Sequence, residues 1–166
     1  MQLSESEKRH LLAAEGWLEL GLTSDAAEEL ESIHADKREH PDVLKVQWEV
    51  CRQLKQWELC VQGGAALVKL QPDDAQGWIH RSFALHELKR TQDAYDLLRP
   101  VLETFPAETT IPYNLACYSA QLGEHERAFE FLDTAFTRAG NQAKEMKLQA
   151  LDDPDLEPIW TEIAAD

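Results

Sequence analysis

The sequence has 166 residues, of which 43% are hydrophobic, and its formal net charge is -15. This length suits one domain with a substantial buried core. A nucleic-acid-binding protein needs a basic stripe to replace the counterions on phosphates, and the absence of one excludes DNA or RNA as the main partner. The acids concentrate at the ends, since residues 1–42 hold eleven acids and four bases, and residues 107–166 hold twelve and four.

Residues 1–8 are rich in Ser and Glu and lack the apolar stretch of a signal peptide, and no part of the chain approaches a membrane span. We therefore expect a cytoplasmic protein without membrane contact. The three cysteines, Cys51, Cys60 and Cys117, are odd in number and fall within helical patterns. This argues against a disulfide framework and favours free thiols.

The chain repeats itself every 34 residues. Leucine recurs at Leu20, Leu54, Leu88 and Leu122, and six residues after each leucine comes a small residue: Ala26, Cys60, Ala94 and Ala128. A period of this length indicates one supersecondary unit that is copied and stacked, because a single helix pair cannot bury its apolar face alone.

Taken in chain order, the elements form a single predicted domain over 1–166. Ser4 and Glu7 fit a capping box that opens the first helix. Units of two helices follow at about 7–40, 41–74, 75–108 and 109–142. A capping segment, 143–166, contains a last helix that begins at Asp153–Pro154 and forms a lid over the stack. Its apolar face comprises Leu156, Ile159, Trp160 and Ile163.

These units resemble the tetratricopeptide repeat (TPR). The third unit carries the framework residues Trp78, Leu85, Ala94, Leu98 and Pro106, and the fourth carries Leu115–Ala116, Gly123 and Ala128. The resemblance implies an all-α, right-handed superhelix, or α-solenoid, of about four helix pairs with a C-terminal capping helix. The second unit departs most from the pattern, because Trp48 replaces a small residue and Gly64 a large one. We expect these two to compensate each other.

If the first helices line the inside of the stack, the stripe opposite the packing stripe forms a groove. Phe83 and Tyr113 are its candidate aromatic anchors, and Cys117 should be accessible to a thiol reagent there. The residues of this predicted groove are Lys45, Glu49, Arg52, Ile79, His80, Phe83, His86, Tyr113, Asn114 and Cys117.

The chain contains no phosphate loop, nucleophile elbow, CxxC pair or helical His-Glu-x-x-His pattern, so we predict neither an enzyme nor a cofactor or metal. His80 and His86 share the groove stripe with Cys117, but a spacing of six places the two histidines on different sides of a helix, which favours contact with a peptide. The TPR clamp for a C-terminal carboxylate is not expected, because Glu49 stands where the clamp has asparagine.

The sequence thus predicts a non-enzymatic scaffold or adaptor that binds a partner protein or peptide in the concave groove. Two alternatives stay open. The chain is similar in size and layout to small bacterial kinesin-light-chain-like TPR proteins, which implies a filament- or polymer-associated protein that binds bacterial tubulin. The other alternative is a secretion-type TPR chaperone that holds an unfolded client. The sequence does not identify the partner.

Overall fold

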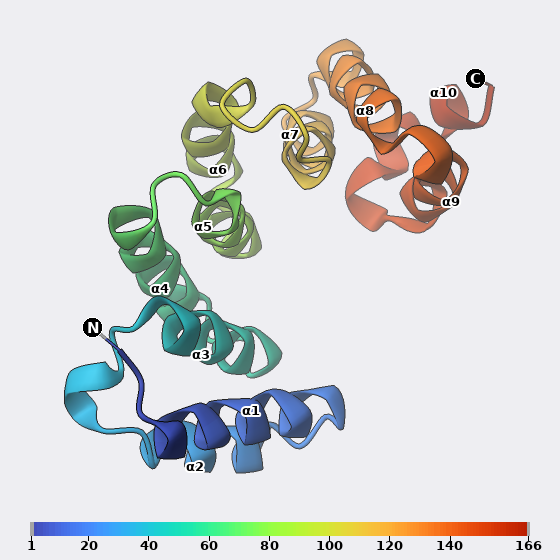
Figure 1. Ribbon diagram of the computed structural model, residues 1–166. Coiled ribbons are helices and arrows are strands. Elements are labelled where there is room, and N and C mark those ends of the chain that lie inside the picture. Colours follow the sequence, from blue (N-terminus) through green and yellow to red (C-terminus); the bar gives the residue numbers. More distant parts are fainter. Residues whose placement is uncertain (1, 166) are drawn as a thin grey trace. The chain divides into compact units, whose positions relative to one another are not determined.

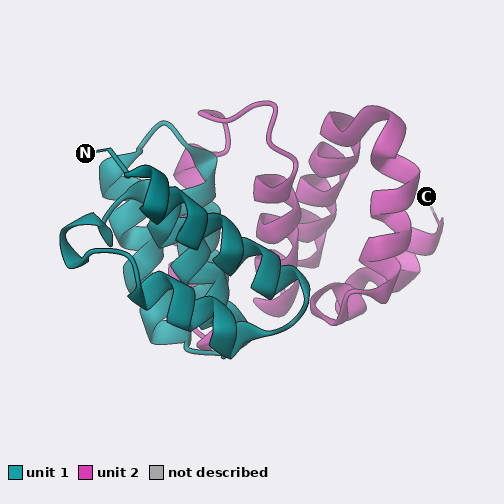
Figure 2. Ribbon diagram, turned by 60° about the horizontal axis from the view of Figure 1, so that its bottom comes forward, with its two compact units in different colours: residues 1–84 teal, residues 85–166 magenta. Residues whose placement is uncertain are grey.

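The computed structural model describes residues 2–165, and its regular structure there is entirely helical, which confirms the all-α prediction (Figure 1). The chain forms two compact units, Met1–Ala84 and Leu85–Asp166, which we call unit 1 and unit 2 (Figure 2). The α-helices are α1 (Glu5–Glu19), α2 (Thr23–Glu31), α3 (Pro41–Gln53), α4 (Trp57–Leu70), α5 (Ala75–Glu87), α6 (Thr91–Leu98), α7 (Thr110–Gln121), α8 (His125–Ala139), α9 (Ala143–Asp152) and α10 (Trp160–Ala165). The 3-10 helices are η1 (Ala35–Lys37), η2 (Arg99–Val101), η3 (Gly140–Gln142) and η4 (Pro154–Ile159).

The predicted capping box begins the first helix. The Ser4 hydroxyl accepts a hydrogen bond from the backbone N–H of Glu7 at 3.3 Å, and the Glu7 carboxylate accepts one from the backbone N–H of Ser4 at 2.7 Å. These reciprocal bonds satisfy donors that have no partner within the helix.

The turn inside each helix pair is the same at all four positions. Gly21, Lys55, Lys89 and Gly123 have positive φ values of 73°, 55°, 61° and 79°. In each turn the next residue donates its N–H to the carbonyl oxygen five residues earlier, as in Leu22 to Trp17 and Glu124 to Ser119. This is the Schellman arrangement, in which a left-handed residue ends the helix. The 34-residue period of the sequence is therefore a period of backbone conformation.

The recurring small residues are packing positions. Ala26, Cys60, Ala94 and Ala128 have no exposed surface. In unit 1, α1, α2 and α3 close over an aliphatic core that contains Leu11, Leu30, Ile33, Val43, Val46 and Val50. Close packing of such side chains supplies most of the stability of helix pairs.

The expected compensation between Trp48 and Gly64 is wrong. A Cβ atom on Gly64 would lie 2.8 Å from the backbone of Arg81, so glycine lets α4 approach the α5 backbone closely. The glycine that faces the indole is Gly63, where an added Cβ would lie 3.7 Å from Trp48 Cδ1. The unusual residue sizes in this repeat therefore reflect two separate contacts, that of Gly64 with the Arg81 backbone and that of Trp48 with Gly63.

The predicted lid covers unit 2. Leu156, Ile159 and Ile163 are fully buried, which confirms their packing role. The lid begins as the 3-10 helix η4 and becomes α-helical only at Trp160, whose indole N–H donates to the Ala150 carbonyl at 3.0 Å. Pro158 lies within this segment, and a proline lacks the amide hydrogen that a continuous α-helix requires.

Candidate functional site

Unit 1 contains a shallow pocket, here called the first-helix pocket, on the side formed by α1, α3 and α5. Its volume is about 390 Å³. Leu18 and Val46 give it an apolar part. Three predicted groove residues, Lys45, Glu49 and His80, line it, and the remaining lining residues are Glu15, Glu19, Gln53 and Gln76.

Lys45, which lines the first-helix pocket, and Arg52, which contacts the lining residue Glu49, both have acidic partners. Lys45 Nζ lies 2.7 Å from Asp74 Oδ2, and the Arg52 guanidinium donates to both carboxylate oxygens of Glu49, at 2.7 and 2.5 Å. Hydrogen bonds from Lys45 and Arg52 lower the pKa values of Asp74 and Glu49, so both carboxyls are ionised.

Two further carboxylates at this pocket have no such partner. Among the described residues, neither Glu15 nor Glu19 makes an ion pair. Sequence reasoning missed both, although Glu15 stands one period before Glu49. The charge that the pocket leaves uncompensated is therefore negative.

An aromatic cluster lies against this pocket. The rings of Trp48 and His80 stack with their centroids 3.7 Å apart and an interplanar angle of 9°. Phe83 packs edge-on against Trp48 and Trp57, at 6.4 and 5.9 Å. Burial lowers the pKa of His80 to about 4, so its ring is neutral at pH 7. Phe83 is partly buried and packs against the core cluster of Trp48, Cys51, Cys60 and Ala84.

In unit 2 three of the predicted groove residues, His86, Tyr113 and Cys117, lie beneath the chain's own C-terminal segment. The Tyr113 hydroxyl donates to Asp153 Oδ2 at 2.9 Å, and the Cys117 thiol lies 3.8 Å from the same oxygen. His86 Nε2 is hydrogen-bonded to Asp155 Oδ2 at 3.0 Å. All three side chains are buried, so the predicted accessibility of Cys117 is wrong.

Further hydrogen bonds hold this acidic turn in place. Asp153 Oδ1 accepts the backbone N–H of Asp155 at 3.0 Å, and the Asp155 carbonyl accepts the Gln121 amide at 2.8 Å. His86 Nδ1 lies 3.0 Å from the hydroxyl of Thr91. The turn is thus a structural clasp, and we use the term aspartate clasp for Asp153, Asp155 and their partners.

Within residues 2–165, Cys117, Asp153 and Asp155 are the one group whose potential metal-ligand atoms lie within 4.8 Å of one another. Burial and the neighbouring carboxylates raise the pKa of Cys117 well above its usual value. A protonated thiol is a poor ligand and a poor nucleophile, and both carboxylates already have protein donors. The group therefore fits the clasp better than a metal or catalytic site.

The other two predicted residues, Ile79 on α5 and Asn114 on α7, are partly exposed. The structure brings Lys45, Glu49 and Arg52 together with His80 in unit 1, and His86, Tyr113 and Cys117 together in unit 2. The first set borders an open pocket and the second set is covered.

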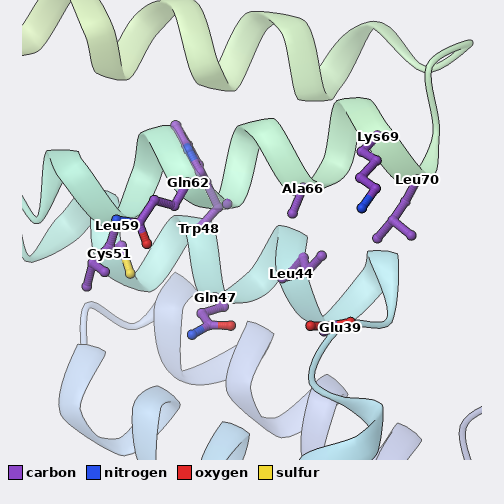
Figure 3. Close-up of a pocket in the computed structure, with 11 residues that line it drawn as sticks. Glu39, Leu44, Gln47, Trp48, Cys51, Leu59, Gln62, Ala66, Lys69 and Leu70 are labelled. Carbon is purple, nitrogen blue, oxygen red and sulfur yellow. The ribbon is translucent and has the colours of Figure 1, made fainter.

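Unit 1 carries a second pocket between α3 and α4, here called the outer pocket, with a volume of about 340 Å³ (Figure 3). Its surface is mainly apolar, from Leu44, Trp48, Leu59, Ala66 and Leu70. The other lining residues are Glu39, Gln47, Cys51, Gln62, Gly63 and Lys69. The groove prediction did not include this pocket, although the unusual glycines and tryptophan of the second unit mark its position in the sequence.

The repeated helix pairs, their identical turns and the buried small residues define the class: the fold is that of the tetratricopeptide-repeat proteins. None of the described helices has the length and apolar character needed to cross a membrane. The sequence matches no protein-family model and no curated protein.

Solved structures resemble this chain in fold. The thermophilic TPR protein TTC0263 of Thermus thermophilus is 18% identical with a TM-score of 0.69, over 96% of this chain and 100% of that one. MamA MSR-1 is 22% identical with a TM-score of 0.66, over 84% and 78% of the two chains. Another MamA structure is 12% identical with a TM-score of 0.72, over 83% and 81%.

Proposed function

We propose that this chain is a non-enzymatic protein-interaction scaffold that holds a partner segment in the first-helix pocket of unit 1. The observation that carries the proposal is the contrast between this open pocket and the corresponding face of α7, which the aspartate clasp covers. Pockets with an apolar part and a few placed charges are the usual sites of recognition.

The charges favour a basic partner segment. Lys45 and Arg52 are neutralised within the chain, whereas Glu15 and Glu19 are not. A lysine or arginine of the partner would pair with these carboxylates, and an adjacent aliphatic residue would contact Leu18 and Val46. Complementary charge of this kind also steers association, which the net charge of -15 would strengthen.

Non-enzymatic action agrees with the state of the buried thiols. Burial raises the pKa of Cys51 and raises that of Cys60 to about 12, so neither is a ready nucleophile at neutral pH. A cytoplasmic location, the filament-associated alternative and the export-chaperone alternative stay predictions.

The test uses two fluorescent peptides of equal length that differ only in carrying Lys or Glu at alternate positions between leucines. We expect the Lys peptide to bind, and the double variant Glu15→Gln/Glu19→Gln to weaken binding about tenfold. The matched control is Glu28→Gln/Glu31→Gln on α2, which removes the same charge away from the pocket. Equal losses in both variants, or preference for the Glu peptide, would show that binding does not use this pocket.

A further inference from the structure

We propose that the outer pocket of unit 1 is a second docking site, which takes an amphipathic helix of a partner protein. This site is separate from the first-helix pocket, since of their lining residues the two share none. The proposal therefore stands or falls independently of the proposed function.

The walls of the outer pocket are two helices that present residues at helical spacing. On α4 these are Leu59, Gly63, Ala66 and Leu70, and on α3 they are Leu44, Trp48 and Cys51. The stretch from Leu59 to Leu70 runs about 16 Å along α4, which is three helical turns. Figure 3 shows the side chains of Leu44, Trp48 and Cys51 on α3 and of Leu59, Ala66 and Leu70 on α4. An elongated apolar trough between two helices matches the helix-in-groove mode of recognition.

Two leucines on α4 border this trough and remain open to solvent. Leu59 is 49% exposed and Leu70 is 47% exposed. Between them on α4 lie Gly63, which has no side chain, and Ala66, whose side chain is a methyl group, so the backbone of a third helix could approach there. The apolar face of a partner helix would cover both leucines at once.

Gly63 gives the strongest indication that the pocket is kept open. It lies in the interior of α4, where glycine weakens a helix relative to alanine. An added Cβ would meet only Trp48, at an ordinary contact distance of 3.7 Å, so packing inside the chain does not require glycine. Its neighbour Gly64 differs, because a Cβ there would lie 2.8 Å from the Arg81 backbone. Any side chain at position 63 longer than a methyl group would extend into the outer pocket.

The charged residues at the pocket indicate which charges one end of the partner helix should carry. Glu39 and Lys69 lie at the same end as Leu70 (Figure 3). In the part of the chain that the structure describes, neither makes an ion pair. We infer a partner helix with apolar residues at i, i+4 and i+7 and with one basic and one acidic residue near one end, which would pair with Glu39 and Lys69 respectively.

The test is selection from a displayed library of amphipathic helices, in which the apolar face and one end are randomised, against the full chain. We expect selected peptides to carry the i, i+4, i+7 apolar pattern and to bind at least tenfold more weakly to Gly63→Leu. The matched control is Gly16→Leu in α1, where an added Cβ would meet nothing within 4 Å. Gly63→Leu should keep its helicity by circular dichroism, because leucine favours helix.

Three results would overturn the proposal. The first is a library that yields no binder, and the second is a set of binders that Gly16→Leu and Gly63→Leu affect equally. The third is concentration-dependent dimerisation in sedimentation velocity that Gly63→Leu abolishes, which would make a second copy the occupant. Binding of the Lys peptide to the first-helix pocket should be unchanged in Gly63→Leu, so failure here leaves the proposed function untouched.

Discussion

The α3 side of unit 1 and the α7 side of unit 2 derive from the same repeat but differ in what covers them. At equivalent positions two periods apart, Lys45 and Glu49 border an open pocket, whereas Tyr113 and Cys117 lie under the aspartate clasp. A helix stack must end somewhere, and its last apolar face needs a cover. In unit 2 the cover extends beyond the apolar core to the side chains of Tyr113 and Cys117 on α7.

This comparison teaches that the repeat position alone does not define a binding residue. In unit 1, Lys45 and Glu49 border an open pocket with uncompensated negative charge. In unit 2 the equivalent residues Tyr113 and Cys117 are buried, because the segment after the repeats places Asp153 against them. A change in one unit therefore tests whether the stability or the exposure of the other unit depends on it.

The largest expected effect follows removal of the cover. A chain that ends at Gln142 loses the fully buried side chains of Ala150, Leu156, Ile159 and Ile163. At about 1.5 to 3 kcal/mol for each of the three large aliphatic side chains, the loss should be about 4.5 to 9 kcal/mol, comparable to the stability of a small domain. Urea unfolding measures this change.

Thiol labelling shows whether that cover is also what protects the α7 face. Cys117 should react at least tenfold faster in the shortened chain, while Cys51 and Cys60 in unit 1 should be unaffected. Glu157→Ala, an exposed change in the same segment, is the control. Unchanged stability together with slow Cys117 labelling would mean that the segment does not shield unit 2.

A smaller change in stability should follow substitutions on the second helix of a pair, α4 in unit 1 and α6 in unit 2. Position 64 is glycine against the Arg81 backbone, and one period later Leu98 is fully buried. Gly64→Leu should therefore cost about 3 kcal/mol by overpacking, and Gly63→Ala should gain about 0.5 to 1 kcal/mol from helix propensity. Both are measured by urea unfolding.

A double-mutant cycle completes this test. Trp48→Ala should cost about 3 to 5 kcal/mol. Combined with Gly64→Leu, the costs should add to within about 0.5 kcal/mol, because the two residues contact different atoms. Strong coupling would restore the idea that tryptophan and glycine share one space.

Features that depend on local sequence could be predicted. The 34-residue period, the capping box at Ser4 and the burial of Leu156 all follow from spacing and caps within a few residues. The clasp could not be predicted, because Tyr113 and Asp153 are 40 residues apart and Asp153–Pro154 indicates only a helix start. The outer pocket was missed for a similar reason, since it depends on an indole that stacks on the ring of His80, 32 positions further along the chain, and lies beside Gly63.

The partly buried His80 should make the stability of the protein depend on pH. Among the described residues, the Nδ1 atom of His80 is buried and has no hydrogen-bond partner. Folding lowers the pKa of His80 from 6.5 to about 4 through burial, so between these values the unfolded chain binds a proton that the folded chain does not. Stability that is complete above pH 6.5 is therefore lost as the pH falls toward 4, by about 2 kcal/mol at pH 5.

The variant His80→Phe keeps a ring against Trp48 and removes the titration. Its urea midpoint should fall less than that of the parent between pH 7 and pH 5. The control is His34→Gln, an exposed histidine whose removal should leave the parent's pH dependence in place. If His80→Phe and the parent lose stability equally, acids elsewhere account for the pH dependence and His80 does not titrate as described.

The smallest effect tests whether the turns of the two units are truly equivalent. Lys55 in unit 1 and Lys89 in unit 2 adopt the left-handed conformation that Gly21 and Gly123 adopt at the other two turns. A side chain in this conformation costs about 1 kcal/mol, and glycine regains part of that while it raises the entropy of the unfolded chain. Lys55→Gly and Lys89→Gly should therefore each stabilise the protein by about 0.5 kcal/mol in thermal unfolding. The reverse change Gly123→Lys should destabilise it by a similar amount.

Since all four turns have the same backbone hydrogen bonds, Lys55→Gly and Lys89→Gly must change the stability by the same amount. A gain at Lys55 with a loss at Lys89 would show that unit 2 uses the lysine side chain, for example its attraction to Asp155, and that the repeat is conserved in backbone but not in the energy of its turns.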